Sequence, residues 1–311
     1  MTEYLSSWSD TPTRRSVIDF VDKVADPGSE SHVAPRDRVA VFDNDGTLWC
    51  EKPLAQGVFI VKRLAEMARD DPSLHQTQPW KAVVEGNVAW VDDAVTKHYH
   101  GDDSDAQLLA VAIGRAFGDL DVEEFARTAA DFLAAAEHPA YQRPYTELGF
   151  VPMLELLDYL EANEFTCYIV SGGGRDFIRP VTEAMYGIPA DRVAGSSPGL
   201  HFVTDDSGAH VMRTATLDIL DDGPMKPLQI WERIGRRPIL AAGNANGDMP
   251  MLQYATDQPG LTLALLVHHD DDTRKVAYTS GAEQALDQAN DSGWTTVSVA
   301  EDWERVFAHE S

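Results

Sequence analysis

The chain has 311 residues, of which 43% are hydrophobic and 24% charged, so it can form one large globular domain or two modest ones. Acids outnumber bases by 51 to 25, and the net charge of −26 argues against a nucleic-acid or membrane partner. No apolar run approaches the roughly 20 residues of a membrane helix, and the N-terminal segment lacks a signal-peptide core, which predicts a cytoplasmic protein. Cys50 and Cys167 lack metal-ligand spacing and are expected to be small buried residues.

The first predicted strand is the apolar run VAVF at residues 39–42, which leads directly into two acids, Asp43 and Asp45. The character of the chain then changes over residues 53–147. Three stretches there are rich in Ala and Leu and carry apolar residues at helical spacing, at residues 56–70, 104–118 and 121–138. The segments between them, at residues 70–79 and 98–105, are turn-like. This block is therefore expected to be an all-helical insertion.

From residue 151 the pattern alternates between helices and strands. Helices are expected at residues 152–165, 175–187 and 227–235, and strands at 166–170, 192–196, 200–204, 209–213, 238–243 and 261–269. Pro180 is expected to kink the second of these helices or to lie near its first turn. Buried strands that lack alternation and are separated by helices predict an α/β fold, with a parallel sheet covered on both faces.

Polar sequences follow three of the predicted strands. The first strand continues into DNDGT at residues 43–47, the strand TCYIV into SGGGR at 171–175, and the strand PILAAG into NANGD at 244–248. A further segment, GPMK, places Lys226 just ahead of a helix. Because ligands bind at the carboxyl ends of the strands in such sheets, these segments together predict one site.

The residues of this site suit phosphoryl transfer. Asp43 lies at a strand tip and can act as a nucleophile that forms an aspartyl-phosphate. Asp45 can protonate the leaving alkoxide and then act as the general base for water. The Ser171 hydroxyl and the backbone N–H groups of Gly172 and Gly173 suit phosphate oxygens near a helix N-terminus.

The same site contains groups that can balance negative charge. Lys226 supplies a fixed positive charge against the charge that develops during the reaction. Asp248 and Asn244 offer hard oxygens for Mg²⁺, which prefers a few carboxylates, carbonyls and waters. A bound cation would also let an anionic phosphate approach Asp43. Metal, lysine and substrate are therefore expected to neutralise the carboxylates together.

FDNDGT, SGG, Lys226 and GNANGD follow one another in the order of the four motifs of the haloacid dehalogenase (HAD) superfamily. The chain resembles its phosphoserine-phosphatase-like branch over about residues 38–270. The resemblance implies a Rossmann-like parallel-sheet core, with Mg²⁺ bound by Asp43, the main-chain carbonyl of Asp45 and the acidic motif. Asn244 stands where the superfamily more often has Asp, so Asp248 is expected to be the more important metal ligand. Thr47, in the first motif, is a further candidate for phosphate binding.

An insertion directly after the first motif is what the superfamily calls a C1 cap. The resemblance therefore predicts a helical cap domain at residues 53–147 and a HAD core domain made of residues 1–52 and 148–311. A lid in this place would exclude water from the site and contact the organic part of the substrate. It would leave little room for a phosphoprotein.

Three residues near the expected site have open roles. Glu51 could face a substrate amine and Arg175 a substrate carboxylate, although Arg175 could equally cap the helix that follows it. Trp49 is expected to pack.

Other readings of the polar residues are weaker. The DNDG sequence does not fit an EF-hand loop, because Gly46 is the fourth residue rather than the sixth. His98 and His100 resemble a metal pair, but no third ligand is evident, and a polar loop is expected. His268 and His269 end the last core strand and are expected near the rim of the site, with a structural role favoured over a functional one.

Asp45 favours phosphate chemistry, because a dehalogenase of this superfamily needs no metal and has no acid at this position. The first hypothesis is a Mg²⁺-dependent phosphatase for a small phosphomonoester, with phosphoserine as the first candidate and other amino-alcohol or sugar phosphates next. A phosphomutase or phosphotransferase would keep the same motifs and stays open. So does a non-catalytic Mg²⁺- and phosphate-binding sensor, in which Asn244 would be the lesion. The oligomeric state is left open.

Overall fold

β1 (Val39–Phe42) is an apolar strand whose four residues are all buried. It lies in the middle of a seven-stranded sheet with the order β6-β5-β4-β1-β7-β8-β9. The other six strands are β4 (Thr166–Gly174), β5 (Val193–Asp205), β6 (Gly208–Ile219), β7 (Leu240–Gly243), β8 (Leu263–His268) and β9 (Thr295–Ser298). All neighbouring strands pair in parallel except β5 and β6, which are antiparallel. The predicted α/β class is confirmed.

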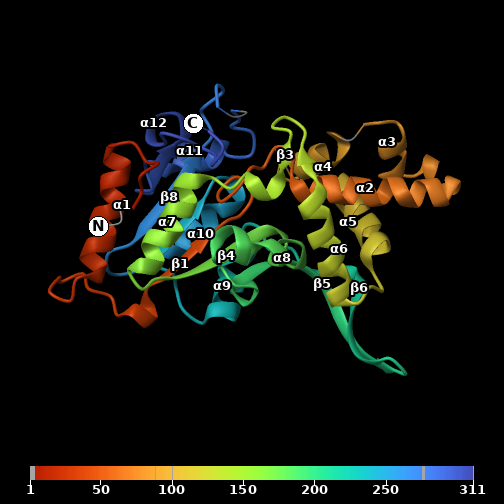
Figure 1. Ribbon diagram of the computed structural model, residues 1–311, viewed down its shortest axis with the longest axis horizontal. Coiled ribbons are helices and arrows are strands. Elements are labelled where there is room, and N and C mark those ends of the chain that lie inside the picture. Colours follow the sequence, from red (N-terminus) through yellow and green to blue (C-terminus); the bar gives the residue numbers. More distant parts are fainter. Residues whose placement is uncertain (1–3, 88, 100, 275–276, 311) are drawn as a thin grey trace.

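The computed structural model describes residues 4–87, 89–99, 101–274 and 277–310. In it, two groups of helices cover the two faces of the sheet (Figure 1). The first group is α1 (Pro12–Ala25), α7 (Val151–Ala162) and α8 (Arg175–Tyr186). The second is α9 (Met225–Ile234), α10 (Met249–Thr256) and α11 (Glu283–Ala289), and a short helix α12 (Val299–Asp302) lies near the C-terminus.

The apolar core is divided by the sheet into two clusters. Ala40 and Phe42 of β1 pack with the first group of helices, whereas Val39 and Val41 pack with the second. Successive side chains of a strand point to opposite faces, so burial of all four requires cover on both sides. Cys50 and Cys167 are buried, as expected.

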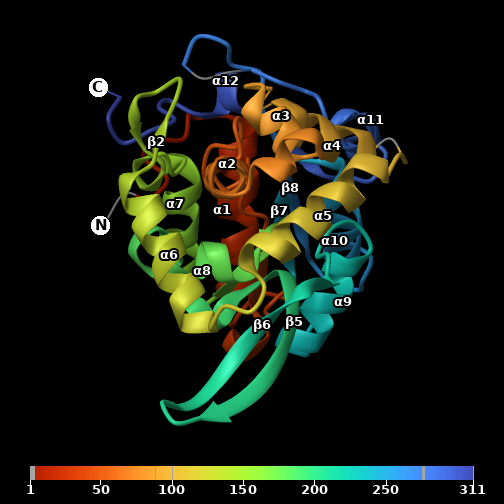
Figure 2. The same ribbon diagram turned by 90° about the vertical axis from the view of Figure 1, so that its right-hand side faces the viewer.

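The stretch expected to be all-helical, residues 53–147, is mostly helical but has two short strands near its end that were not predicted. The elements are α2 (Ala55–Asp70), α3 (Trp80–Val84), α4 (Ala89–Tyr99), α5 (Ser104–Phe117) and α6 (Val122–Ala135), followed by the short strands β2 (Glu137–His138) and β3 (Arg143–Pro144). These helices gather at one side of the sheet, in front in Figure 2. The Phe59 ring lies 4.9 Å from that of Phe117 and 5.2 Å from that of Phe177 in α8, so the helical segment packs on a core helix.

The strand type predicted at residues 192–196, 200–204 and 209–213 is confirmed from residue 193 on, but the division into three short strands is wrong. The structure has two long strands instead, β5 and β6, which form an antiparallel hairpin that projects from the body of the protein (Figures 1 and 2). The turn falls between Asp205 and Gly208, the last pair of the ladder. Its sequence DDSG is a turn signal, so the error came from treating Pro198 and Gly199 as a strand end.

Smaller differences concern element ends. β4 continues through the glycines to Gly174, with a shift of register after Ser171, whereas the predicted strand ended at residue 170. Pro180 lies inside α8 rather than in its first turn. The turn expected at residues 98–105 is shorter, because α4 runs to Tyr99 and α5 begins at Ser104. His100 and the side chain of His98 lie outside the described residues. None of the described helices is long and apolar enough to cross a membrane.

Candidate active site

The strand order brings the three polar segments to adjacent strand ends. β1 lies between β4 and β7, with Phe42 paired to Ile169 on one side and to Ala242 on the other. The Asp43 N–H donates to the Ala242 carbonyl at 2.9 Å, so the two strands stay paired up to the first acid. Asp43, Ser171 and Asn244 therefore leave the same edge of the sheet.

The loop after β1 is a tight turn around one carbonyl. The Asn44 carbonyl accepts from the N–H groups of Thr47 at 3.2 Å and Leu48 at 2.9 Å. Gly46 has φ of +81°, a left-handed conformation that side chains with a Cβ rarely adopt. Its N–H donates to the Trp49 carbonyl at 2.9 Å, which closes the turn. The local sequence thus holds Asp43 and Asp45 on one short, rigid loop.

Lys226 lies at the centre of the site and is 1% exposed. Its Nζ donates to Asp43 Oδ1 at 2.7 Å, to Asp248 Oδ1 at 2.6 Å and to the Val170 carbonyl at 3.0 Å. It is the second residue of α9, and the sequence placed it just ahead of that helix. One ammonium group thus joins the ends of β1 and β4 to the segment after β7.

Asp248 is held by both of its oxygens. Oδ1 binds Lys226, and Oδ2 accepts from the N–H groups of Asn244 at 2.8 Å and Ala245 at 3.0 Å. The side chain is 2% exposed. This carboxylate positions the lysine and closes the loop after β7.

The pKa values of the site reflect this burial. Burial raises the pKa of Asp43 well above its usual value, with Lys226 acting in the opposite direction. Burial also raises the pKa of Asp45 to about 6, although the Trp49 indole, which donates to Oδ1 at 2.9 Å, lowers it. Burial alone would lower the pKa of Lys226, but Asp248 and Asp43 raise it well above the usual value.

The glycines after β4 lie beside the first motif. The Gly173 N–H donates to Ser171 Oγ at 3.0 Å, and Ser196 Oγ donates to the Gly172 carbonyl at 2.8 Å. A Cβ at Gly173 would lie 3.1 Å from Asp45 Oδ2 and 3.2 Å from Ser171 Oγ. The structure therefore brings the candidate phosphate-binding segment against the candidate acid.

The remaining predicted residues divide between two places. Thr47 donates to Asn244 Oδ1 at 3.2 Å, and Asn244 Nδ2 donates to Glu51 Oε2 at 3.2 Å. Arg175 is elsewhere engaged: its Nε donates to Asp176 at 2.9 Å, and it is 7% exposed. The side chains of Thr47 and Glu51 thus surround Asn244, while Arg175 is bound by its own neighbour.

Three residues at the site had no motif to announce them. Gln56 of α2 accepts the Gly174 N–H at 2.7 Å. His269 Nε2 lies 2.7 Å from the Gly46 carbonyl, and its ring stacks on that of Tyr278 with centroids 4.4 Å apart. The place of His269 after a core strand was a signal for it. Gln56 and Tyr278 gave none.

The donors present fit a hard divalent cation. Asp43, Asp45 and Asp248 place three carboxyl groups around the single ammonium of Lys226, which leaves an excess of negative charge. Among the described residues, no group of three or more His, Cys, Asp or Glu side chains is arranged to hold a metal. A site here would therefore use carboxylate, carbonyl and amide oxygens together, a set that Mg²⁺ accepts with waters and substrate oxygens.

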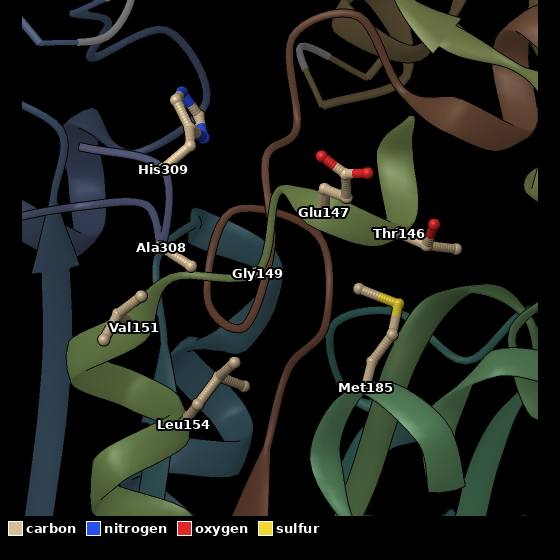
Figure 3. Close-up of a pocket in the computed structure, with 8 residues that line it drawn as sticks. All are labelled: Thr146, Glu147, Gly149, Val151, Leu154, Met185, Ala308 and His309. Atoms are coloured by element: carbon tan, nitrogen blue, oxygen red, sulfur yellow. The ribbon is translucent and has the colours of Figure 1, made fainter. Parts of the chain in front are cut away.

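A separate pocket of about 370 Å³ lies away from these residues (Figure 3). Its lining residues are Thr146, Glu147, Gly149, Val151, Leu154, Met185, Ala308 and His309. In Figure 3 the His309 side chain lies to the left and the Glu147 side chain to the right, well apart, and they do not point toward one another. None of the candidate catalytic residues lines it.

A comparison with known protein families matches the chain to the family that its motifs indicate. The model of the haloacid dehalogenase-like hydrolase family matches residues 40–253. A search of curated protein sequences found no match. Among solved structures, a protein of unknown function from Anaerococcus prevotii has 14% identity and a TM-score of 0.58, over 95% of this chain and 94% of that one.

Two other solved structures are similar at a comparable identity. A protein of unknown function from Bordetella pertussis has 15% identity and a TM-score of 0.54, over 84% of this chain and 97% of that one. A phosphoserine phosphohydrolase-like protein from Francisella tularensis has 14% identity, over 80% and 98% of the two chains, with a TM-score of only 0.39. The family model spans more than half of the chain and includes all four motifs, so the chain belongs to the haloacid dehalogenase-like hydrolase family.

Proposed function

We propose that the protein is a metal-dependent phosphatase that hydrolyses a small phosphomonoester through an aspartyl-phosphate on Asp43. The observation that carries this proposal is the buried Lys226, bonded to Asp43 at 2.7 Å and to Asp248 at 2.6 Å where the strands end. Such a group stabilises negative charge on a transferring phosphoryl group without reorganising during the reaction.

In the first step, an Asp43 carboxylate oxygen attacks phosphorus and the bond to the leaving alkoxide breaks. Lys226 binds Oδ1, so Oδ2 is the oxygen left for attack. Asp45 gives its proton to the alkoxide, which leaves as the alcohol. A pKa of about 6, raised by burial, keeps part of this group protonated near neutral pH.

In the second step, the ionised Asp45 takes a proton from water as the water oxygen attacks phosphorus. The bond between phosphorus and Asp43 breaks, which releases inorganic phosphate and restores the carboxylate. The Trp49 indole binds Asp45 Oδ1 at 2.9 Å, which fixes the acid in one orientation for both steps. Ser171 and the Gly172 and Gly173 backbone are the proposed partners of the phosphate oxygens.

The proposed metal ligands are Asp43 Oδ1, the main-chain carbonyl of Asp45, Asn244 Oδ1 and Asp248 Oδ1. Asp248 Oδ1 also accepts from Lys226 and keeps a second lone pair, whereas the two backbone N–H groups of the loop after β7 both bind Oδ2. Bound Mg²⁺ would offset the negative charge of the substrate phosphate and of Asp43.

The helices between β1 and β4 are proposed to act as the cap, residues 53–147. Gln56 of α2 reaches Gly174 at 2.7 Å, so this segment contacts the proposed phosphate-binding loop. A cap so close favours a small polar substrate over a phosphoprotein. Phosphoserine remains the first candidate, and amino-alcohol and sugar phosphates are next.

The test is release of inorganic phosphate from p-nitrophenyl phosphate by the purified protein. We expect activity with Mg²⁺, none in excess chelator, and poor recovery with Ca²⁺, which favours more ligands at longer distances. Asp43→Asn should abolish turnover, because an amide cannot form the acyl-phosphate. The exposed Asp10→Asn removes the same charge and should leave the rate unchanged.

Four outcomes would contradict this function. Full activity in chelator would exclude the metal, and a largely active Asp43→Asn variant would exclude the nucleophile. Transfer of phosphate to a second organic acceptor instead of water would identify a mutase or phosphotransferase. A protein that binds Mg²⁺ and phosphate but never turns over any member of a phosphometabolite panel would be a sensor.

A further inference from the structure

The side-chain amide of Asn244 is fixed on both sides. Its Oδ1 accepts from the Thr47 hydroxyl at 3.2 Å and its Nδ2 donates to Glu51 Oε2 at 3.2 Å. Asn244 is 2% exposed, so water does not compete for these bonds. A carboxylate partner can only accept, which requires the amide nitrogen to face Glu51 and the amide oxygen to face the nucleophile loop.

Glu51 also contacts groups other than Asn244. Its second oxygen, Oε1, lies 3.4 Å from Nζ of Lys52, and its side chain is 17% exposed. Burial and the nearby Glu51 carboxylate together raise the pKa of the Tyr278 phenol. A Cβ at Gly46 would lie 2.3 Å from Asn244 Nδ2 and 2.8 Å from Glu51 Oε2. The Asn244 amide and the Glu51 carboxylate therefore both pack closely against Gly46, in the loop that carries the proposed nucleophile and acid.

The contact between Asn244 and Glu51 is stable with one negative charge, on Glu51, but a second carboxylate at position 244 would be repelled by it. An Asp at position 244 would place a carboxylate oxygen about where Nδ2 now lies, 3.2 Å from Glu51 Oε2. Two carboxylates so close disfavour joint ionisation. Conversely, a hydrogen bond from an amide to a carboxylate draws electron density toward the amide oxygen. Partners of this kind strengthen a metal ligand from outside its contact with the metal.

We propose that Asn244 and Glu51 act as one metal-binding unit, in which Asn244 Oδ1 is the ligand and Glu51 supplies the negative charge through Nδ2. Oδ1 accepts one bond from Thr47 and has a second lone pair for the cation. This inference rests on the proposed metal dependence and adds a residue from outside the fourth motif. It also replaces the reading of Glu51 as a contact for a substrate amine.

Exchanging the charge within the pair tests the proposal. Mg²⁺ binding to the full-length protein is measured by isothermal titration calorimetry for wild type, Glu51→Gln, Asn244→Asp and the double variant. We expect Glu51→Gln to weaken Mg²⁺ binding about 10- to 100-fold, the range for partners that support a metal ligand. The double variant restores one charge in the same place and should recover most of that loss.

The Tm of the metal-free protein gives a second readout. Asn244→Asp should unfold at a lower temperature than the double variant, because it alone sets two carboxylates in contact. Glu161→Gln, on α7 and 42% exposed, removes one charge away from the site and should behave as wild type in both measurements. If Asn244→Asp does not fold, Glu51→Gln and the double variant still decide the question.

Several results would overturn the proposal. Glu51→Gln binding Mg²⁺ as wild type does, or the double variant binding as weakly as Glu51→Gln, would remove Glu51 from the metal site. A raised KM at saturating Mg²⁺ with unchanged metal affinity would return Glu51 to the substrate. Failure of the wild-type protein to bind Mg²⁺ at all would instead contradict the proposed function, and is seen before any variant is made.

Discussion

Lys226 uses every proton of its ammonium group. The three bonds to Asp43, Asp248 and the Val170 carbonyl account for its three donors. Two of them fix its charge between the carboxylates, and the third ties it to the end of β4, next to Ser171. The geometry of the charge therefore depends on α9 staying where it is.

Asp221 lies shortly before Lys226 in the chain and is also buried, but among the described residues its carboxylate lacks the hydrogen bonds that Lys226 makes. It is 0% exposed, and within the described part of the chain neither carboxylate oxygen has a hydrogen-bond partner. Burial raises its pKa to about 7, with Asp222 adding to the increase and Lys226 and Arg233 opposing it. A carboxyl group in this position is held neutral by the fold over much of the acidic range.

The raised pKa of Asp221 predicts a pH-dependent stability. Between pH 3.8, the usual value, and about 7, the folded protein retains a proton that the unfolded chain releases. The free energy of unfolding therefore falls as pH rises through this range, by at most about 1.4 kcal/mol per unit. The Asp221→Asn variant has no carboxyl group at this position, so its free energy of unfolding should not fall with pH for this reason. Urea unfolding of the metal-free variant and wild type should show a difference that grows from pH 5 to 7 and then levels off.

The matched control for this prediction is Asp218→Asn, an exposed acid at the end of β6. It removes the same charge without releasing a buried group, so its difference from wild type should stay constant over that pH range. A constant difference for Asp221→Asn as well would show that its carboxyl is solvated in solution.

Some residues of the candidate site could be predicted from the sequence, and others could not. Asp43, Ser171, Lys226 and Asp248 were predictable because each adjoins an apolar strand or a helix start, and the structure brings them together. The engagement of Asn244 with Glu51 was not, since it joins two loops far apart in the chain. From the sequence alone, Asn244→Asp is expected to be tolerated or to tighten Mg²⁺ binding, because it adds a hard negative oxygen. The contact with Glu51 predicts a lower Tm for this variant instead.

At the scale of elements, the Gln56 side chain of α2 contacts β4 near the site. Gln56 Oε1 accepts from the Gly174 N–H, which lies at the start of α8 and has no partner within that helix. A Cβ at Gly174 would lie 2.7 Å from Gln56 Nε2, so the fit is close on both sides. This bond joins the proposed cap to the proposed phosphate-binding loop.

Gln56→Ala should therefore lower kcat/KM while leaving the fold intact. A neutral hydrogen bond contributes about 0.5–1.5 kcal/mol, which corresponds to a loss of roughly 2- to 10-fold. The measurement is kcat/KM with p-nitrophenyl phosphate, alongside thermal unfolding. Gln107→Ala, exposed on α5, is the control and should change neither value. A wild-type rate for Gln56→Ala would mean that α2 does not influence the site.

The type of a helix or strand could be predicted from the sequence where its apolar residues follow a regular pattern. β1 and β8 read as strands because every residue of the apolar run is covered, and α6 read as a helix from its 3.6-residue period. Parts of β5 and β6 were also predicted as strands, but their continuity as one long hairpin was not, because its outer part leaves the core. β9 and α1 lie outside the motifs, yet β9 is part of the seven-stranded sheet and α1 packs in the apolar core.

At the scale of the whole molecule, one arginine connects three parts of the chain. Arg213 of β6 donates to Asp176 of α8 at 3.1 Å and to the Phe117 carbonyl at the end of α5 at 3.3 Å. Its guanidinium also lies 3.6 Å from the ring centroid of Phe125 in α6. The hairpin, a core helix and the helical insertion thus share one buried cation.

Arg213→Met keeps the length of the side chain and removes these bonds. We expect a loss of about 2 kcal/mol or more in the free energy of unfolding, because a buried carbonyl loses its donor and Asp176 loses one partner. Amides of α6 and β6 should also exchange hydrogen faster. Mass spectrometry of hydrogen exchange and urea unfolding test both expectations. Arg192→Met, which breaks an exposed pair at 3.8 Å, should change little in either.

The projecting hairpin also determines how neighbouring molecules can meet. Beyond Ser196, β5 pairs only with β6 among the described residues, and Phe202 is 69% exposed and Leu200 47% exposed on this free strand. An open, apolar strand edge is a template for pairing with another chain. The net charge of −26 opposes such encounters through repulsion that reaches about 10 Å at 0.1 M salt but only about 3 Å at 1 M. We therefore expect electrostatic repulsion to keep the molecules apart in dilute salt. Concentrated salt screens this repulsion but leaves the exposed edge of β5 unchanged, so association through that edge should increase.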